Sequence, residues 1–278
     1  MSVRGILLTP TIKDEICKNL TFEDAINFRD ALNLPSLKCQ ISIKDNDRQV
    51  LFLEGVNDNT IVANFEIQKY GSNEALRRAS RSNHLELVQL LLNAGADVNN
   101  NAVDQNGNTA LISASEKGFL EIVQVLVNAG ASVVNINESN MYGDTALMLA
   151  SGNGNLEIVK ILVNAGAIIN KINQSESTAL IIASRTNHYE VVKFLLENGA
   201  NVNLVSQYGN TALMWAAYNG NLETVRALLE NKITKVNVNA ISQGGYTALD
   251  WASRNKHKKV VELLKSYGAR LVSELDED

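Results

Sequence analysis

The feature that most constrains this chain is a tripeptide, Thr-Ala-Leu, that returns at a nearly fixed interval. It occurs five times in the 278 residues, and successive copies are 36, 33, 33 and 36 residues apart. The copies begin at Thr109, Thr145, Thr178, Thr211 and Thr247. A degenerate copy, Glu74-Ala75-Leu76, precedes the first by 35 residues. Self-similarity at this period predicts a stacked array of small units rather than one globular core.

The third copy shows what one unit contains. Thr145 stands where the N-cap of a helix belongs, and a short helix is expected from Ala146 to about Ser151. Gly152-Asn153-Gly154 breaks this helix, and Gly166 ends a second one. The apolar stripe of the second helix is Leu156, Val159, Leu162 and Val163. Two helices of this size cannot bury their apolar faces alone, so the units must stack.

These units resemble ankyrin repeats, with Thr-Ala-Leu in place of the usual Thr-Pro-Leu. The resemblance covers about residues 70–272, or some six units. It implies an all-α solenoid of stacked helix pairs, with β-hairpin loops projecting at right angles. It also implies a non-enzymatic scaffold or adaptor that binds a partner protein through a concave groove.

The chain is expected to have three parts. Residues 1–69 lack the repeat and form a small, mainly helical N-terminal domain, and residues 273–278 form an acidic tail. The expected units are 70–103, 104–139, 140–172, 173–205, 206–241 and 242–272.

Two units depart from the pattern. Lys232 stands where a helix-ending glycine is expected, so the fifth unit should end differently from the others. Glu176 replaces the hairpin glycine of the fourth unit, so that turn should be altered. The last unit has a basic cluster between Lys256 and Lys265, which is typical of a solvated capping helix or of a surface that attracts an anionic partner.

The histidines and cysteines are the residue types here that could suggest catalysis, but their positions favour a structural function. His84, His188 and His257 each lie ten residues after the start of a unit, in the turn between two helices, where histidine or asparagine can bond to backbone groups. Cys17 and Cys39 have no histidine near them in sequence and are expected to be inert. We therefore expect no catalytic site, no metal site and no cofactor.

Composition narrows the class of partner. The net charge of −5 disfavours general nucleic-acid binding, and the short apolar runs disfavour membrane insertion. The two cysteines favour a reducing, intracellular and cytoplasmic location. Asparagine is abundant and only 2 prolines occur, which we interpret as the compositional bias of an AT-rich genome. The expected partner is a protein, whose identity the sequence does not give.

The resemblance also implies which residues face the groove. These are the hairpin tips and the ends of the first helices, where tyrosine and arginine are typical of binding hot spots. The predicted binding residues are Tyr142, Asn153, Arg185, Tyr208, Tyr218, Tyr246 and Arg254. Alternatively, the hairpin tyrosines pack only against the next hairpin. Trp215 and Trp251 lie inside the first helices and are expected in the core.

Residues 9–34 are weakly similar to an F-box. The similarity rests on Glu15-Ile16, Leu20 and Glu23-Asp24. It implies a ubiquitin-ligase substrate adaptor that docks a Skp1-like protein, with Ile16, Leu20 and Phe22 as docking residues. The alternative is a helical cap on the first repeat. Residues 40–43 and 50–53 are short strands or helix fragments.

Overall fold

The computed structural model describes residues 39–43, 49–53, 66–67, 69–99, 102–130 and 133–275. These residues belong to two compact units of the chain. The first unit ends at Asp97, and the second begins at Val98 and also takes in residues 80–83.

The first unit contains a β-hairpin and a helix pair. Strand β1 (Cys39–Ile43) pairs antiparallel with β2 (Gln49–Leu53), so the segments that the sequence left open are strands. Helices α4 (Ser72–Arg81) and α5 (Leu85–Asn93) form a helix pair, and α4 contains the degenerate copy of the motif. Cys17 and the predicted docking residues Ile16, Leu20 and Phe22 lie outside the described residues.

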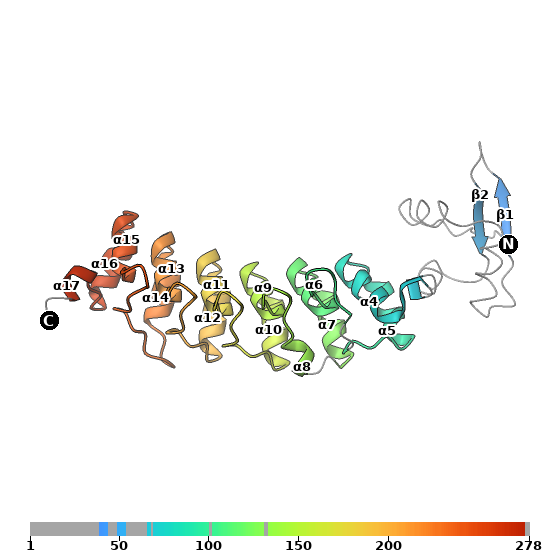
Figure 1. Ribbon diagram of the computed structural model, residues 1–278, viewed down its shortest axis with the longest axis horizontal. Helices are drawn as coiled ribbons and strands as arrows, with labels where there is room; N and C mark the ends of the chain where they lie inside the picture. The colour runs from blue at the N-terminus through green and yellow to red at the C-terminus, as the bar shows by residue number, and fades with distance from the viewer. Residues whose placement is uncertain are drawn as a thin grey trace. The chain divides into compact units, whose positions relative to one another are not determined.

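The second unit is a series of helix pairs. Each pair has a first helix that begins at a Thr-Ala-Leu motif and a second helix antiparallel to it. First helices pack on first helices and second helices on second helices, so the pairs form two rows (Figure 1). The helices of this unit are α6 (Ala110–Lys117), α7 (Leu120–Asn128), α8 (Val133–Ile136), α9 (Ala146–Gly152), α10 (Leu156–Asn164), α11 (Ala179–Thr186), α12 (Tyr189–Glu197), α13 (Ala212–Asn219), α14 (Leu222–Leu229), α15 (Ala248–Arg254), α16 (Lys258–Ser266) and α17 (Val272–Leu275). The predicted solenoid of stacked helix pairs is confirmed.

The threonine of the motif caps each first helix, as predicted. Its backbone is extended and its hydroxyl accepts a hydrogen bond from the amide three residues on, as from Met148 to Thr145 at 3.3 Å. Thr247 forms a full capping box, because Asp250 also accepts a bond from the Thr247 amide at 2.9 Å. Such caps stabilise a helix by about 1 kcal/mol each.

Small side chains let the first helices approach one another. Ala150, Ser151, Ala183 and Ser184 are all fully buried. The second helices contribute the larger apolar groups, and in α10 the buried residues are Ile158, Val159 and Leu162. Val159 and Leu162 were predicted for this stripe, whereas Leu156 and Val163 are only half-buried at its edges.

The two predicted departures have different outcomes. Helix α14 ends at Leu229, and Asn231 then forms its own turn, accepting from the Ile233 amide and donating to the Thr234 carbonyl. The prediction that the fifth unit ends differently is therefore confirmed. The prediction for Glu176 is wrong. Glu176 adopts the left-handed conformation of the missing glycine, with φ 55°, and its amide bonds to Asn173 O at 2.9 Å, so the turn is unchanged.

Asparagine side chains join the loops of successive repeats. Asn170 is typical: it donates to Gly199 O at 3.2 Å and accepts from the Asn201 amide at 2.9 Å. The equivalent residues, which we call the asparagine ladder, are Asn99, Asn137, Asn170, Asn203 and Asn239, and each donates to a carbonyl in the segment that follows the next second helix. Part of the asparagine content thus has a structural function that we had not predicted.

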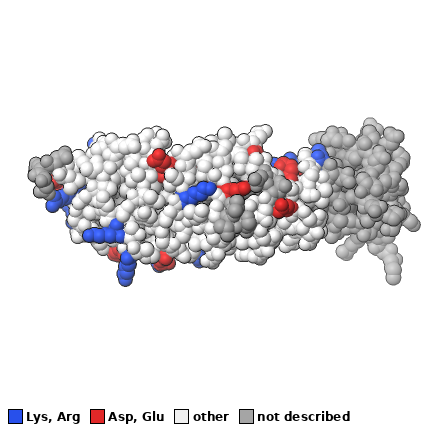
Figure 2. Space-filling model, turned by 60° about the horizontal axis from the view of Figure 1, so that its bottom comes forward, with Lys and Arg blue, Asp and Glu red and all other residues white. Residues whose placement is uncertain are grey.

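Charged side chains are sparse over much of the face seen in Figure 2. Among the described residues, no helix is long and apolar enough to cross a bilayer. The last helix, α17, takes in Glu274 and Leu275 of the predicted acidic tail.

Candidate partner-binding site

Successive hairpins are bonded edge to edge into a ribbon. The amide of Gln174 donates to Tyr142 O at 3.0 Å, and the amide of Gln243 donates to Tyr208 O at 3.1 Å. Two further bonds of this kind join the other hairpins of the second unit, Met141 N to Asn106 O and Gln207 N to Ser175 O, both at 2.9 Å. The ribbon therefore holds the hairpin tyrosines at fixed spacing. We call the surface made by these hairpins and by the ends of the first helices the inner face.

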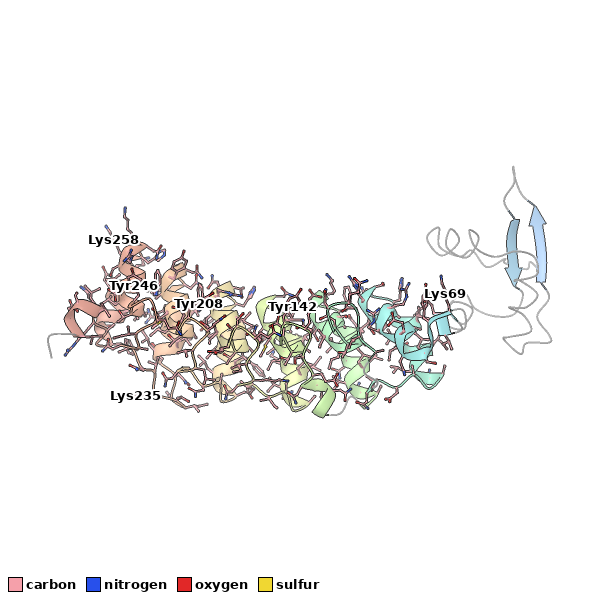
Figure 3. The ribbon with its side chains drawn as sticks, viewed as in Figure 1. Lys69, Tyr142, Tyr208, Lys235, Tyr246 and Lys258 are labelled. Atoms are coloured by element: carbon pink, nitrogen blue, oxygen red, sulfur yellow. The ribbon has the colours of Figure 1, made fainter. Side chains whose placement is uncertain are left out.

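Tyr142 and Tyr208 project from this ribbon. These residues are 52% and 66% exposed. Neither tyrosine is therefore buried against the next hairpin, as the alternative interpretation would require. Figure 3 shows Tyr142, Tyr208 and Tyr246 spaced along the array, with Lys235 at its opposite edge. Exposed tyrosines on a rigid backbone are suited to binding because little conformational entropy is lost when they contact a partner.

Four aromatic side chains form a chain of contacts across the last two repeats. The ring centroid of Tyr218 is 6.1 Å from that of Trp215 and 5.4 Å from that of Trp251, both edge to face. Tyr246 lies 4.8 Å from Trp251. We call Trp215, Tyr218, Tyr246 and Trp251 the aromatic cluster. Edge-to-face contacts of this kind contribute about 0.5–1.5 kcal/mol each.

The tryptophans were predicted to be core residues, and this prediction is wrong. Both are only half-buried, although the Trp215 indole N–H is enclosed and has no acceptor. At the same position other repeats have Leu149 and Ile182, which are also half-buried. The tryptophans therefore lie at the surface, in contact with two of the tyrosines predicted to bind a partner, rather than in the core.

An arginine lies at each end of the aromatic cluster. The Arg185 guanidinium is 5.6 Å from the Trp215 ring, and that of Arg254 is 4.6 Å from the Tyr246 ring. The structure thus brings together Arg185, Tyr218, Tyr246 and Arg254, four of the predicted binding residues, with the tryptophans between them. Tyr208 projects from the neighbouring hairpin, whereas Tyr142 lies two repeats earlier.

These arginines differ from the equivalent arginine of the first repeat. Arg81 forms an ion pair with Asp104 of the next hairpin, at 3.7 Å. Ser206 takes the place of that aspartate beside Arg185. In the part of the chain that the structure describes, neither Arg185 nor Arg254 has a carboxylate within 4.0 Å. Both remain free to meet an anionic group.

Asn153 has a structural partner. Its side chain donates to Glu116 O of the preceding repeat at 2.7 Å, and Asn219 does the same to Arg185 O at 2.8 Å. Asn153 is exposed, but its amide nitrogen is already used between repeats.

Two of the three histidines, His188 and His257, are structural, as predicted. His188 Nε2 lies 3.0 Å from Gly152 O, and His257 Nε2 lies 2.9 Å from Tyr218 O, so each ring joins a turn to the preceding repeat. Within the described residues, no three His, Cys, Asp or Glu side chains are grouped so as to hold a metal ion.

The fold and the site define a class of protein: a stack of two-helix units with a continuous hairpin edge, which exposes aromatic and arginine side chains on one face. The family model for ankyrin repeats (3 copies) matches residues 45–137, 132–206 and 203–274. The chain belongs to the ankyrin-repeat family, whose repeats are generally protein–protein interaction modules.

A solved structure supports this assignment. The chain is similar to an ankyrin repeat domain from Acinetobacter baumannii AYE, with 29% identity and a TM-score of 0.63. The match covers 70% of this chain and 98% of that domain. No curated protein matches the chain. The F-box similarity of residues 9–34 stays a prediction.

Proposed function

We propose that this protein is a non-enzymatic scaffold that binds a partner protein through the inner face of its last three repeats. The observation that carries the proposal is the aromatic cluster with its two arginines, neither of which has a carboxylate partner among the described residues. Tyrosine, tryptophan and arginine dominate the energetics of protein interfaces. The site spans three repeats, so it exists only in the assembled stack.

The surroundings of the site support binding rather than catalysis. The rings of His188 and His257 are engaged with backbone carbonyls. Asp250 is used in the capping box of Thr247 and accepts a further bond from the Val272 amide.

The test is quantitative recovery of bound proteins from a native lysate. A Tyr208→Ala/Tyr218→Ala variant of the tagged full chain should recover specific partners at least about tenfold less well than the unmodified chain, because hot-spot residues contribute about 2 kcal/mol or more. Tyr208→Ala alone, which removes an exposed ring, should show part of this loss without loss of stability.

Tyr267→Ala is the matched control. Tyr267 is 42% exposed, as Tyr218 is, but it follows the second helix of the last repeat. Its substitution should leave recovery unchanged. Equal recovery of all partners by the double variant and by the control, with both variants folded by thermal unfolding, would contradict the proposal.

A further inference from the structure

The last repeat departs from the others by accumulating positive charge at one end. Nine residues after the motif starts, the other five repeats have glycine or asparagine, and this repeat has Lys256. Eleven residues after, they have leucine or tyrosine, and this repeat has Lys258. Twelve residues after, all five have glutamate, and this repeat has Lys259. Together with Arg254 these lysines form what we call the cationic end, and all four side chains are exposed.

These lysines lower the stability of the last repeat, and a repeat that only caps the stack does not need them. Lys256 has φ 61°, in the left-handed region that disfavours residues with a Cβ. Lys258 and Lys259 lie in the first turn of α16, where the helix dipole favours acidic residues, and α5, α7, α10, α12 and α14 each have a glutamate there. A polar cap needs neither positive charge nor a left-handed lysine, so solubility alone does not account for the substitutions.

The cationic end is continuous with the aromatic cluster. His257 Nε2, 2.9 Å from Tyr218 O, fixes the turn that carries Lys256 against the end of α13. Arg254 lies over the Tyr246 ring at 4.6 Å. Figure 3 shows Lys258 and Tyr246 on the same side of the array, away from Lys235. No ion pair joins any of these four cations to a carboxylate of the described residues.

We propose that this combined surface binds an acidic peptide segment of the partner protein. Carboxylates of the segment meet Arg254, Lys256 and the lysines of α16, and an adjacent apolar side chain contacts the aromatic cluster. The inference rests on the proposed function and specifies the chemistry of the partner. Complementary charge of this kind would raise the association rate and select the partner.

A peptide fits the surface better than a nucleic acid. The chain has a net charge of −5, and four exposed cations are few for a phosphate backbone, whose binding depends on many Lys and Arg contacts. The rings of the aromatic cluster contact one another and the arginines, whereas single-stranded nucleic acids need open ring faces on which bases stack.

The test is selection of random peptides, displayed on phage, against the full chain. Enriched peptides should carry net negative charge and at least one large apolar residue. A synthetic peptide from the selection should bind a Lys256→Gly/Lys259→Glu variant at least about tenfold more weakly, and binding to the unmodified chain should weaken as salt rises. Both substitutions restore residues found at these positions in other repeats, so the variant should fold. Lys235→Glu, at the opposite edge of the array, should bind the peptide unchanged.

The outcomes separate this inference from the proposed function. The selection could instead enrich neutral or basic peptides that no longer bind the Tyr208→Ala/Tyr218→Ala variant. That result would overturn the inference that the ligand is acidic, and it would support the proposal that a partner binds the inner face. Acidic peptides that bind all variants equally would overturn both. Tighter binding of a mixed-sequence single-stranded DNA oligonucleotide than of the selected peptides would also overturn the inference. Failure to enrich any peptide would overturn it too, while the lysate experiment decides the proposed function independently.

Discussion

At the scale of single residues, the turn between the two helices of a repeat shows how sequence position and backbone geometry are matched. His188 reaches across to the preceding repeat, and its ring occupies the space beside Gly154. A Cβ on Gly154 would lie 2.4 Å from His188 Nδ1, so this glycine is required both by its φ of 74° and by the histidine. Gly220 and His257 are related in the same way, at 2.5 Å.

Lys256 occupies this glycine position in the last repeat, and replacing it should stabilise the fold. A left-handed lysine costs about 1–2 kcal/mol relative to glycine, and glycine loses about 0.5–1 kcal/mol through greater backbone entropy. We expect Lys256→Gly to raise the free energy of unfolding by about 0.5–1 kcal/mol, measured by urea denaturation.

Lys259→Gly is the control for this prediction. Lys259 lies in helix α16, where glycine should instead lower the stability by about 1 kcal/mol. Equal loss of stability in both variants would show that the backbone at Lys256 is not strained.

At the scale of elements, the asparagine ladder connects the loops. Each asparagine lies before one repeat's hairpin and bonds to the segment after that repeat's second helix, as Asn170 does to Gly199 O and to the Asn201 amide. The ladder therefore satisfies backbone groups that a helix end would leave unpaired. It contributes order to segments that have no regular secondary structure.

Asn170→Ala tests this function. Loss of two exposed hydrogen bonds should destabilise the protein by about 1–2 kcal/mol in urea denaturation, given a net value near 1 kcal/mol per bond. Asn164→Ala is the matched control, because Asn164 is exposed at the end of α10 and has no side-chain hydrogen bond within the described residues. A loss that is the same for both variants would mean that the ladder does not stabilise the loops.

Some elements could be predicted from the sequence and others could not. The first helices could, because a buried threonine cap followed by small residues specifies where they begin and what they pack against. The hairpin at Glu176 could not, because the four hydrogen bonds that Asn173 makes within that turn hold it in place despite the left-handed glutamate. Those bonds come from Asn173, three residues earlier, so the residue at position 176 does not by itself reveal them.

The site was only partly predictable for a similar reason. Tyr218 and Arg254 follow from their register positions, but the exposure of Trp215 and Trp251 depends on how much of each large ring the adjacent repeat covers. The side chain four residues after the threonine is half-buried in two other repeats as well. The position in the repeat therefore indicates that these side chains are not fully buried.

At the scale of the whole molecule, the second unit is a linear stack in which each repeat contacts its neighbours along two helix rows and one hairpin ribbon. Such a stack can change specificity through a few surface residues without changing its core. We propose that in this chain those residues are in the last three repeats, where aromatic rings and cations without described carboxylate partners coincide.

The most direct test of the central claim, that a partner protein binds the inner face, is photo-crosslinking from single positions in the full chain. A benzophenone amino acid at Tyr208, which is 66% exposed, should capture a specific partner, and the same amino acid at Tyr267 should not. Excess peptide from the phage selection should reduce the crosslink from position 208. Capture from position 267 with none from position 208 would contradict the claim.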